Sequence, residues 1–321
     1  MKQSTIRSLA AIAVLAPAFA CTSATVQNAT VIPAPATTST PATSAAPSGN
    51  VRTIGTVGAP VGLQLWSLRS MSKEPGAMLR LTRSMGITHV ETAGLYGMTP
   101  QQFGDSIRAA GLRVTSMHVG LDAFTKEPQK VIADAKALGA TYVGTAWYPH
   151  QGAFTEADAR KAIADFNAIG KTMKDAGLQF FYHNHGYEPV AYGDGTLLDL
   201  IIRETDPNLV KFEMDVLWTF LPNVDPAALI RKYPGRFKLM HIKDMKPGVP
   251  RGSLTGGLPD SLQAVIGQGQ VNWPEVMKAA KADGLEYYYL EDETPDPKGN
   301  IPPSVAYLGG IKYAGGSAAG G

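Results

Sequence analysis

The chain has 321 residues, of which 44% are hydrophobic and 17% are charged, and its formal net charge is +2. This length and apolar content suffice for one large buried core, and a barrel of about 250 residues is a common single-domain size. The low net charge, with no cluster of Lys and Arg beyond the N-terminus, argues against a nucleic-acid partner.

Residues 1–20 have the order of a secretory signal peptide: basic residues, an apolar run over Leu9–Leu15, then the small residues Ala18 and Ala20. The single cysteine, Cys21, follows directly, where bacterial lipoproteins carry the thiol that receives lipid. Cleavage by an ordinary signal peptidase would instead leave a free N-terminal thiol. In both cases we predict export, with the protein either periplasmic or membrane-anchored as a lipoprotein through Cys21, and no other membrane contact.

Two further segments have the composition of disordered chain. Residues 21–57 are rich in Ala, Thr, Pro and Ser without a sustained period, which indicates a flexible linker. Residues 314–321 are almost wholly Gly and Ala, which indicates a disordered tail. One domain is therefore expected over residues 58–313.

Within this domain a helix-like stretch, a glycine and an apolar strand recur. The glycines, among them Gly86, Gly111, Gly177 and Gly284, suit the left-handed residue that ends a helix. Helical periodicity and capping residues are clearest in residues 155–176 and 272–282. Eight strands are predicted by these signals, over residues 61–66, 87–91, 112–118, 141–147, 178–184, 209–215, 237–243 and 286–291.

Eight alternations of strand and helix predict an α/β fold of the (β/α)₈, or TIM barrel, type. The main competitor is a doubly wound open sheet, which a glycine-rich phosphate turn after the first strand would favour. The corresponding segment, Leu65–Ser70, contains no glycine.

Four predicted strands end in clusters of side chains that can bind metals or move protons. They are Tyr182–His185, Glu213 with Asp215, His241–Asp244 and Glu291–Glu293. Because the carboxyl ends of parallel barrel strands meet at one face, we expect these clusters to converge on one pocket. A single histidine at a strand end is weak evidence, whereas four such clusters in succession indicate a site.

These motifs, together with the segments around Trp66, Glu91, His118 and Trp273, make the chain resemble the xylose isomerase-like barrel superfamily, often called sugar phosphate isomerase/epimerase, over about residues 60–313. The resemblance implies one divalent ion, Mn²⁺, Co²⁺, Zn²⁺ or Fe²⁺. Its implied ligands end the fifth to eighth strands: His183, Asp215, His241 and Glu291.

His183 departs from the family pattern, which has a glutamate there that also transfers protons. Symmetric epimerisation by two glutamates is therefore in doubt. His185 and Glu188, in the same loop, are alternative ligands if the register slips.

The resemblance implies proton abstraction next to the carbonyl of a sugar, through an enediolate that the metal stabilises. We expect a sugar isomerase or epimerase, or alternatively a lyase that dehydrates its substrate or eliminates a keto-glycoside. A non-catalytic carbohydrate-binding lipoprotein is a further alternative. A phosphodiester-cleaving barrel ranks last, because it needs more metal ligands and a basic groove. Export argues against a phosphorylated substrate, so a small non-phosphorylated sugar is the expected partner.

For catalysis we single out Glu291, which is also a ligand, with His185 and Lys243. An ion pair with Asp244 is the alternative for Lys243. A substrate or acid/base role is expected for His118.

Further residues are expected to contact or orient the substrate. Glu91 and Glu213 are expected to orient substrate or ligands. Trp66, Trp147 and Trp218 either stack on a sugar or pack in the barrel. The long Gly- and Pro-rich connection over residues 245–268 is a candidate lid.

Overall fold

A computed structural model describes residues 51–313. The predicted signal peptide, Cys21, most of the predicted linker and the tail from residue 314 lie outside the described residues. Within the described range, every helix is too short or too polar to cross a bilayer.

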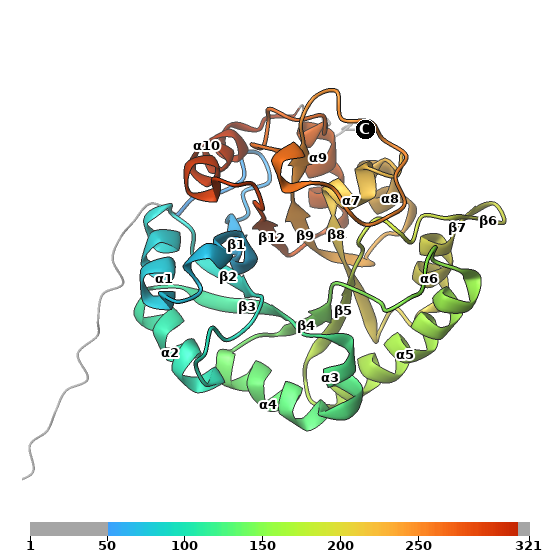
Figure 1. Cartoon of the computed structure of the whole chain (residues 1–321), viewed down its shortest axis with the longest axis horizontal. Helices are drawn as coiled ribbons and strands as arrows, with labels where there is room; N and C mark the ends of the chain where they lie inside the picture. Colours follow the sequence, from blue (N-terminus) through green and yellow to red (C-terminus); the bar gives the residue numbers. More distant parts are fainter. Residues whose placement is uncertain (1–50, 314–321) are drawn as a thin grey trace, which may run out of the picture. The chain divides into compact units, whose positions relative to one another are not determined.

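Eight parallel strands close into a barrel, as the sequence predicts, and helices surround it (Figure 1). Around the barrel the strand order is β1-β12-β9-β8-β5-β4-β3-β2, and β1 pairs with both β12 and β2. The barrel strands are β1 (Gly62–Gln64), β2 (His89–Thr92), β3 (Arg113–His118), β4 (Tyr142–Thr145), β5 (Gln179–His183), β8 (Val210–Asp215), β9 (Phe237–Ile242) and β12 (Tyr287–Leu290).

The helices follow the strands in chain order and pack apolar faces onto the barrel. They are α1 (Pro75–Ser84), α2 (Pro100–Ala109), α3 (Leu121–Lys126), α4 (Pro128–Leu138), α5 (Glu156–Asp175), α6 (Leu197–Glu204), α7 (Val216–Phe220), α8 (Pro226–Lys232), α9 (Trp273–Asp283) and α10 (Pro297–Gly310), with the 3₁₀ helices η1 (Leu65–Met71) and η2 (Asp260–Leu262).

Local sequence explains where the two best-predicted helices begin. Thr155 caps α5, and its side chain and that of Asp158 form a reciprocal capping box. Asn272 caps α9, whose second residue is a proline. Gly139 and Gly284 end α4 and α9 in the left-handed conformation, with φ of 86° and 75°.

Residues 51–57 differ from the prediction, which placed them in the disordered linker. Ile54 is fully buried, and the N–H of Gly55 donates to the carbonyl of Leu308 in α10. The backbone of Thr53 also bridges to Pro60. The end of the predicted linker therefore packs against the barrel, because Ile54 brings an apolar side chain that the low-complexity composition around it obscures.

The lower half of the barrel interior is filled by aromatic side chains. Tyr142, Phe181 and Tyr289 form one buried cluster with Leu239. His89 lies against Tyr289, and a side chain at Gly62 would collide with this histidine. Because the floor of the barrel is packed, a ligand can enter only from the other end.

Short strand pairs shape two of the loops. β6 (Ala191–Tyr192) pairs with β7 (Gly195–Thr196), and β10 (Asp244–Met245) pairs with β11 (Gln263–Ala264). The second pair closes the base of the long loop that follows β9. Asp260 in this loop forms an ion pair with Arg69 after β1, at 2.9 Å, so the loop is tied to the segment that follows β1.

Candidate metal centre

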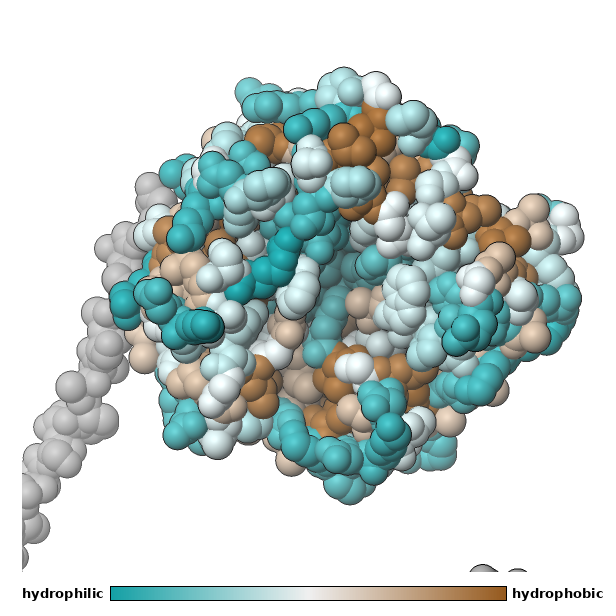
Figure 2. Space-filling model, viewed as in Figure 1, coloured by the Kyte–Doolittle hydropathy of each residue, from teal (hydrophilic) through white to brown (hydrophobic). Residues whose placement is uncertain are grey.

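A pocket of about 210 Å³ opens where the barrel strands end. Figure 2 shows a hollow at the centre of the barrel with hydrophilic residues inside it. Most of the lining comes in pairs two residues apart, because alternate residues of a strand point to the same side. The lining residues are Gln64, Trp66, Ala93, His118, Ala146, His183, His185, His241, Lys243, Glu291 and Glu293.

Side chains from four strands meet beside this pocket in what we call the upper cluster: His183, Asp215, His241 and Glu291. Ligand atoms of Asp215, His241 and Glu291 all lie within 4.8 Å of one another. Nε2 of His183 lies 3.7 Å from Oδ2 of Asp215. These are the four residues that the family resemblance implies as metal ligands, and the barrel brings them together.

One oxygen atom of the upper cluster is suited to bind a cation. Oδ2 of Asp215 is buried and has no hydrogen-bond partner among the described residues. Nδ1 of His241 and Nζ of Lys243 lie 3.8 and 3.7 Å from it. A buried carboxylate oxygen without a partner costs free energy that a bound cation would recover. The donor set, two imidazoles and two carboxylates, fits a divalent metal ion.

A second group of side chains, which we call the lower cluster, consists of Glu91, His118 and Glu213, and of these three only His118 lines the pocket. Oε2 of Glu213 lies 2.8 Å from Nε2 of His118, 3.0 Å from Nδ1 of His183 and 3.2 Å from Nε2 of His241. Both carboxylates are fully buried and neither lines the pocket. Of the two roles predicted for Glu91 and Glu213, the geometry therefore supports orienting ligands rather than contacting substrate.

The strands are irregular where they carry the lower cluster. The register of β2 against β3 shifts between Val90 and Glu91, and that of β8 against β9 shifts between Phe212 and Glu213. Such bulges turn a side chain away from the direction that regular pleating would give it. They help to place the two carboxylates under the histidines.

His183 and His241 link the two clusters, because each ring presents one nitrogen to each cluster. His183 faces Glu213 through Nδ1 and Asp215 through Nε2. His241 faces Glu91 through Nε2, at 2.6 Å, and Glu291 through Nδ1, at 3.0 Å. Carboxylates that bind the outer nitrogen of a histidine fix its tautomer and orientation as a metal ligand.

The charge state of His183 agrees with this arrangement. Burial, with the neighbouring imidazoles, holds the pKa of His183 well below its usual value, so the ring stays neutral. The Glu213 carboxylate faces Nδ1, so we assign the ring proton there. Nε2 then directs its lone pair toward Asp215, as a metal ligand requires.

Burial and neighbouring charges shift other groups of the two clusters. Burial raises the pKa of Asp215 to about 6, and burial with repulsion from Glu91 raises that of Glu213 to about 7. Burial by itself lowers the pKa of His118, but Glu91 and Glu213 outweigh it and raise this pKa to about 10. The protonated His118 is thus a counter-ion to the two carboxylates.

Lys243 does not form the predicted alternative ion pair with Asp244. Its ammonium lies 2.7 Å from Oε2 of Glu291 and 2.7 Å from Oε2 of Glu293. Asp244 instead accepts hydrogen bonds from the indole N–H of Trp273 and from backbone N–H groups. The reason is strand alternation, since Lys243 points into the barrel and its neighbour points out.

The alternative ligands in the loop after β5 do not join either cluster. Oε1 of Glu188 accepts hydrogen bonds from the Tyr182 hydroxyl at 2.6 Å and from the His185 N–H at 2.8 Å. This carboxylate is fully buried and does not line the pocket, so the geometry does not support Glu188 as the alternative ligand. The His185 ring lines the pocket but belongs to neither the upper nor the lower cluster.

The three tryptophans occupy different environments. Trp66 lines the pocket with 44% of its surface exposed, and its indole N–H donates to Glu293 at 3.0 Å. Trp147 is 42% exposed. Trp218 is buried under the ring of His185, with ring centroids 4.7 Å apart, so of its two predicted roles the geometry supports packing in the barrel.

Sequence reasoning gave no role to three polar residues of the site, although it named Glu293 within the cluster Glu291–Glu293. Gln64 and Ser116 donate hydrogen bonds to the two oxygens of Glu91, and Glu293 pairs with Lys243. Period-two spacing offered a signal for two of them. Gln64 stands two residues before Trp66, and Glu293 stands two residues after Glu291.

Comparison with known proteins agrees with the barrel fold. A family model described as xylose isomerase-like TIM barrel matches residues 79–312. A solved structure of a sugar phosphate isomerase/epimerase from Parabacteroides distasonis is similar with a TM-score of 0.66 and 28% identity, covering 78% of this chain and 99% of that chain. A zinc-bound structure of the protein IolI shares the fold alone, with a TM-score of 0.60 and 12% identity over 78% of this chain and 94% of that chain.

Among curated proteins, the inosose dehydratase of Clostridium beijerinckii is 26% identical over 144 residues, which is 43% of this chain and 48% of that protein. An inosose dehydratase of Clostridium tetani is 25% identical over 150 residues, 45% of this chain and 50% of that protein. The chain thus spans about half the length of the curated relatives it matches.

Proposed function

Because the chain belongs to the xylose isomerase-like TIM barrel family, we propose that it is a metal-dependent enzyme that removes a proton next to the carbonyl group of a non-phosphorylated sugar. The observation that carries this proposal is the unpartnered Oδ2 of Asp215 within the upper cluster. A divalent ion held by His183, Asp215, His241 and Glu291 would polarise the carbonyl and stabilise the charge that develops on its oxygen.

In this proposal, the side chains around the ion hold the charges and contact the sugar. Lys243 and His241 lower the pKa of the buried Glu291 carboxylate, so it stays ionised, which suits a metal ligand but makes it a weak general base. Glu291 and Asp215 hold the pKa of Lys243 above its usual value, so Lys243 stays an ammonium group that can donate to a substrate oxygen. His185 and Trp66, which also line the pocket, contact the sugar in this proposal.

Two outcomes follow from the same proton removal. Return of the proton to carbon gives isomerisation or epimerisation, and loss of an oxygen substituent from the next carbon gives a lyase. The carboxylates in the pocket lining, Glu291 and Glu293, both come from the end of β12, while imidazoles line the side near β3 and β5. Two carboxylate bases on opposite faces of a sugar are not available in that lining. This favours the lyase outcome, which also agrees with the similarity to proteins named inosose dehydratase.

The isomerase or epimerase outcome is the second candidate, and similarity to the structure from Parabacteroides distasonis supports it. Both outcomes suit a substrate without phosphate. Lys243 is the only Lys or Arg in the pocket lining, and two carboxylates already neutralise it. A phosphate group would meet no unpaired Lys or Arg there.

The experiment begins with the metal content of the mature protein. We expect the wild type to bind one divalent ion and Asp215→Asn to lose it. The matched control is Asp194→Asn, whose carboxylate is 92% exposed and lies on the β6–β7 loop. Failure to bind Mn²⁺, Co²⁺, Zn²⁺ or Fe²⁺ would reject the enolisation mechanism and favour the carbohydrate-binding alternative.

The metal-loaded protein is then incubated with keto sugars in deuterium oxide. Deuterium at the carbon next to the carbonyl reports proton removal, and an unsaturated product that absorbs in the ultraviolet distinguishes the lyase from the isomerase. Exchange into no keto sugar of a panel of hexoses and keto-glycosides would contradict the proposed chemistry.

We also propose that the protein is exported and anchored through Cys21. This rests on the order of charged, apolar and small residues over residues 1–20. Cell fractionation of the wild type and of Cys21→Ser tests it. We expect the wild type in the membrane fraction and the variant in the soluble periplasm.

A further inference from the structure

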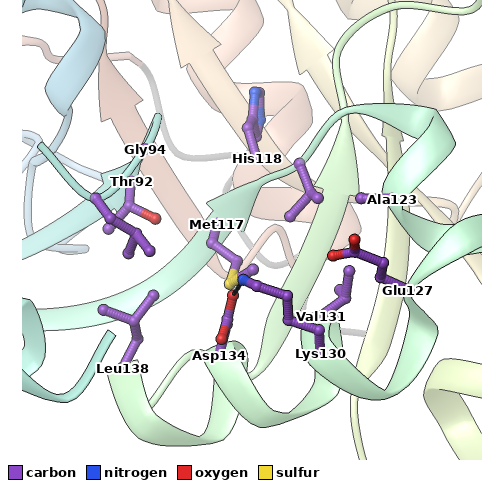
Figure 3. A pocket seen from close by; sticks show the side chains of 12 residues that line it. Thr92, Gly94, Met117, His118, Ala123, Glu127, Lys130, Val131, Asp134 and Leu138 are labelled. Atoms are coloured by element: carbon purple, nitrogen blue, oxygen red, sulfur yellow. Dashed lines mark hydrogen bonds and ion pairs between the residues drawn. The ribbon is translucent and has the colours of Figure 1, made fainter. Parts of the chain in front are cut away.

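A second cavity lies beside the site, between the end of β2, the end of β3 and helices α3 and α4. Its volume is about 160 Å³ (Figure 3). We call it the side pocket. Six hydrophobic side chains supply most of its wall: Leu95, Met117, Val119, Ala123, Val131 and Leu138. Figure 2 shows hydrophobic residues along the rim of the central hollow near α3.

The side pocket adjoins the site pocket along two short segments. His118 lines both cavities, and Figure 3 places it at the upper edge of the side pocket. Ala93 lines the site pocket while Thr92 and Gly94, its chain neighbours, line the side pocket. The small residues Ala93 and Gly94 thus stand at the boundary, and a side chain at Gly94 would meet open space.

The size and lining of the side pocket restrict what can fill it. An apolar cavity of about 150 Å³ accepts a benzene molecule, so this one has room for a single aromatic ring. The charged lining residues are Glu127, Lys130, Asp134 and the protonated His118. Lys130 is already paired with Asp134, and His118 is paired with Glu91 and Glu213 outside the side pocket. The remaining charge is that of a carboxylate, which disfavours an anionic occupant.

We propose that the side pocket is a subsite for the neutral, hydrophobic aglycone of a glycoside whose sugar ring occupies the site pocket. This assignment rests on the proposed function, because it takes the sugar-binding role of the site pocket as given. It names the substrate class as glycosides with an aromatic or similarly apolar substituent. A free monosaccharide would fill the site pocket and leave the apolar wall beside it exposed to water.

Binding tests the assignment without requiring turnover. The metal-loaded protein is titrated calorimetrically with phenyl and methyl glucosides of both anomeric forms. We expect the phenyl glucoside of one anomer to bind at least about tenfold more tightly than its methyl counterpart, because its ring leaves water for an apolar wall. Equal affinity for the phenyl and methyl forms, or binding of neither, overturns the assignment.

A variant with a filled pocket locates the effect. Ala123→Phe on α3 places a ring in the side pocket, and we expect it to abolish the preference for phenyl while leaving the affinity for methyl glucoside unchanged. Ala133→Phe is the matched control, because Ala133 is exposed on α4 and does not line the side pocket. A preference that survives in Ala123→Phe, with normal thermal unfolding, would place the phenyl ring elsewhere and overturn the proposal.

The two proposals fail in different ways. Deuterium exchange into keto sugars tests the chemistry of the site pocket, whereas the ratio of phenyl to methyl affinity tests the side pocket. A phenyl preference without exchange rejects the enolising function alone. Exchange without a phenyl preference rejects the aglycone subsite alone.

Discussion

The ammonium nitrogen of Lys243 lies 2.7 Å from Oε2 of Glu291, the same oxygen that lies 3.0 Å from Nδ1 of His241. A fixed positive charge therefore stands next to two of the proposed metal ligands. In the mechanism that we propose, this charge polarises a substrate oxygen, and it also opposes the binding of a divalent cation. The site combines these two effects in one side chain.

Replacing Lys243 should separate them. In Lys243→Met we expect metal affinity to rise about tenfold, because repulsion of the ion is removed. Turnover of the loaded enzyme should fall about a hundredfold, because the substrate oxygen loses its ammonium partner. Competition with a chelating dye measures the first quantity, and the rate of deuterium exchange measures the second.

Lys246→Met provides the control, since Lys246 is exposed on the same loop. It should leave both quantities at their wild-type values. Weaker metal binding in Lys243→Met would contradict the repulsion that we infer from the short contact with Glu291.

Glu213 should support the metal without touching it. Its Oε2 faces a nitrogen of His118, His183 and His241. We expect Glu213→Leu to weaken metal affinity by about 10- to 100-fold, because the two ligand histidines lose the acceptor that orients them. Isothermal titration with Zn²⁺ measures this loss. Unchanged affinity would mean that the upper cluster holds its geometry without the lower one.

Glu188 is a buried carboxylate that the proposed mechanism does not use. It accepts hydrogen bonds from Tyr182 and from the backbone of His185, and it thereby holds the loop that carries His185 into the pocket. We expect Glu188→Gln to retain near-wild-type exchange, because an amide oxygen can accept the same bonds.

Glu188→Leu should unfold more easily by about 1–3 kcal/mol and lose about tenfold in exchange rate, because the two donors are left buried without a partner. Thermal unfolding and the exchange rate check the pair of variants. Equal losses in Glu188→Gln and Glu188→Leu would show that charge, rather than hydrogen bonding, is what Glu188 contributes.

His89 should make stability depend on pH. It is buried in the barrel floor, neither ring nitrogen has a partner among the described residues, and burial with the nearby charge of Arg113 lowers its pKa to about 4. As the pH falls, His89 therefore binds a proton near pH 6.5 in the unfolded chain but only near pH 4 in the folded chain. Stability contributed by the neutral ring is therefore present above pH 6.5 and lost as the pH falls toward 4, by roughly 3 kcal/mol.

His89→Gln removes this titration. We expect the difference in free energy of unfolding between wild type and variant to shrink as the pH falls from 7 to 4.5, as measured by urea titration at each pH. Other buried groups titrate equally in both proteins, so they cancel in the difference. A difference that stays constant over this range would show that His89 does not control acid stability.

Much of the site was predictable because barrel strands alternate. Residues two apart point to the same side, so His241 with Lys243 and Glu291 with Glu293 both enter the pocket. By the same spacing, Gln64 faces the pocket together with Trp66. Convergence followed from the parallel order of the strands, which sets their carboxyl ends at one face.

The orientation of individual groups was not predictable. Glu91 and Glu213 lie beneath the histidines rather than in the pocket, at points where the strand register shifts. Glu188 points away from the clusters toward the Tyr182 hydroxyl, and Trp218 packs against His185. The carboxylates depend on bulges that leave no local signal, and Trp218 depends on a residue of another strand end. The partners of Glu188 are close in the sequence, but the loop conformation that brings them together is not encoded in a simple period.

The sequence by itself determined the succession of eight strands and helices, because helix caps, glycine positions and apolar periods are properties of neighbouring residues. It also determined which chemical groups end the strands. Only the tertiary structure decided which groups share a hydrogen bond, that Lys243 pairs with Glu291 instead of Asp244, and that an apolar side pocket adjoins the site. The physical reason is that barrel closure and strand register set which side chains of different strands come within about 3 Å of one another. Closure and register are properties of the whole fold.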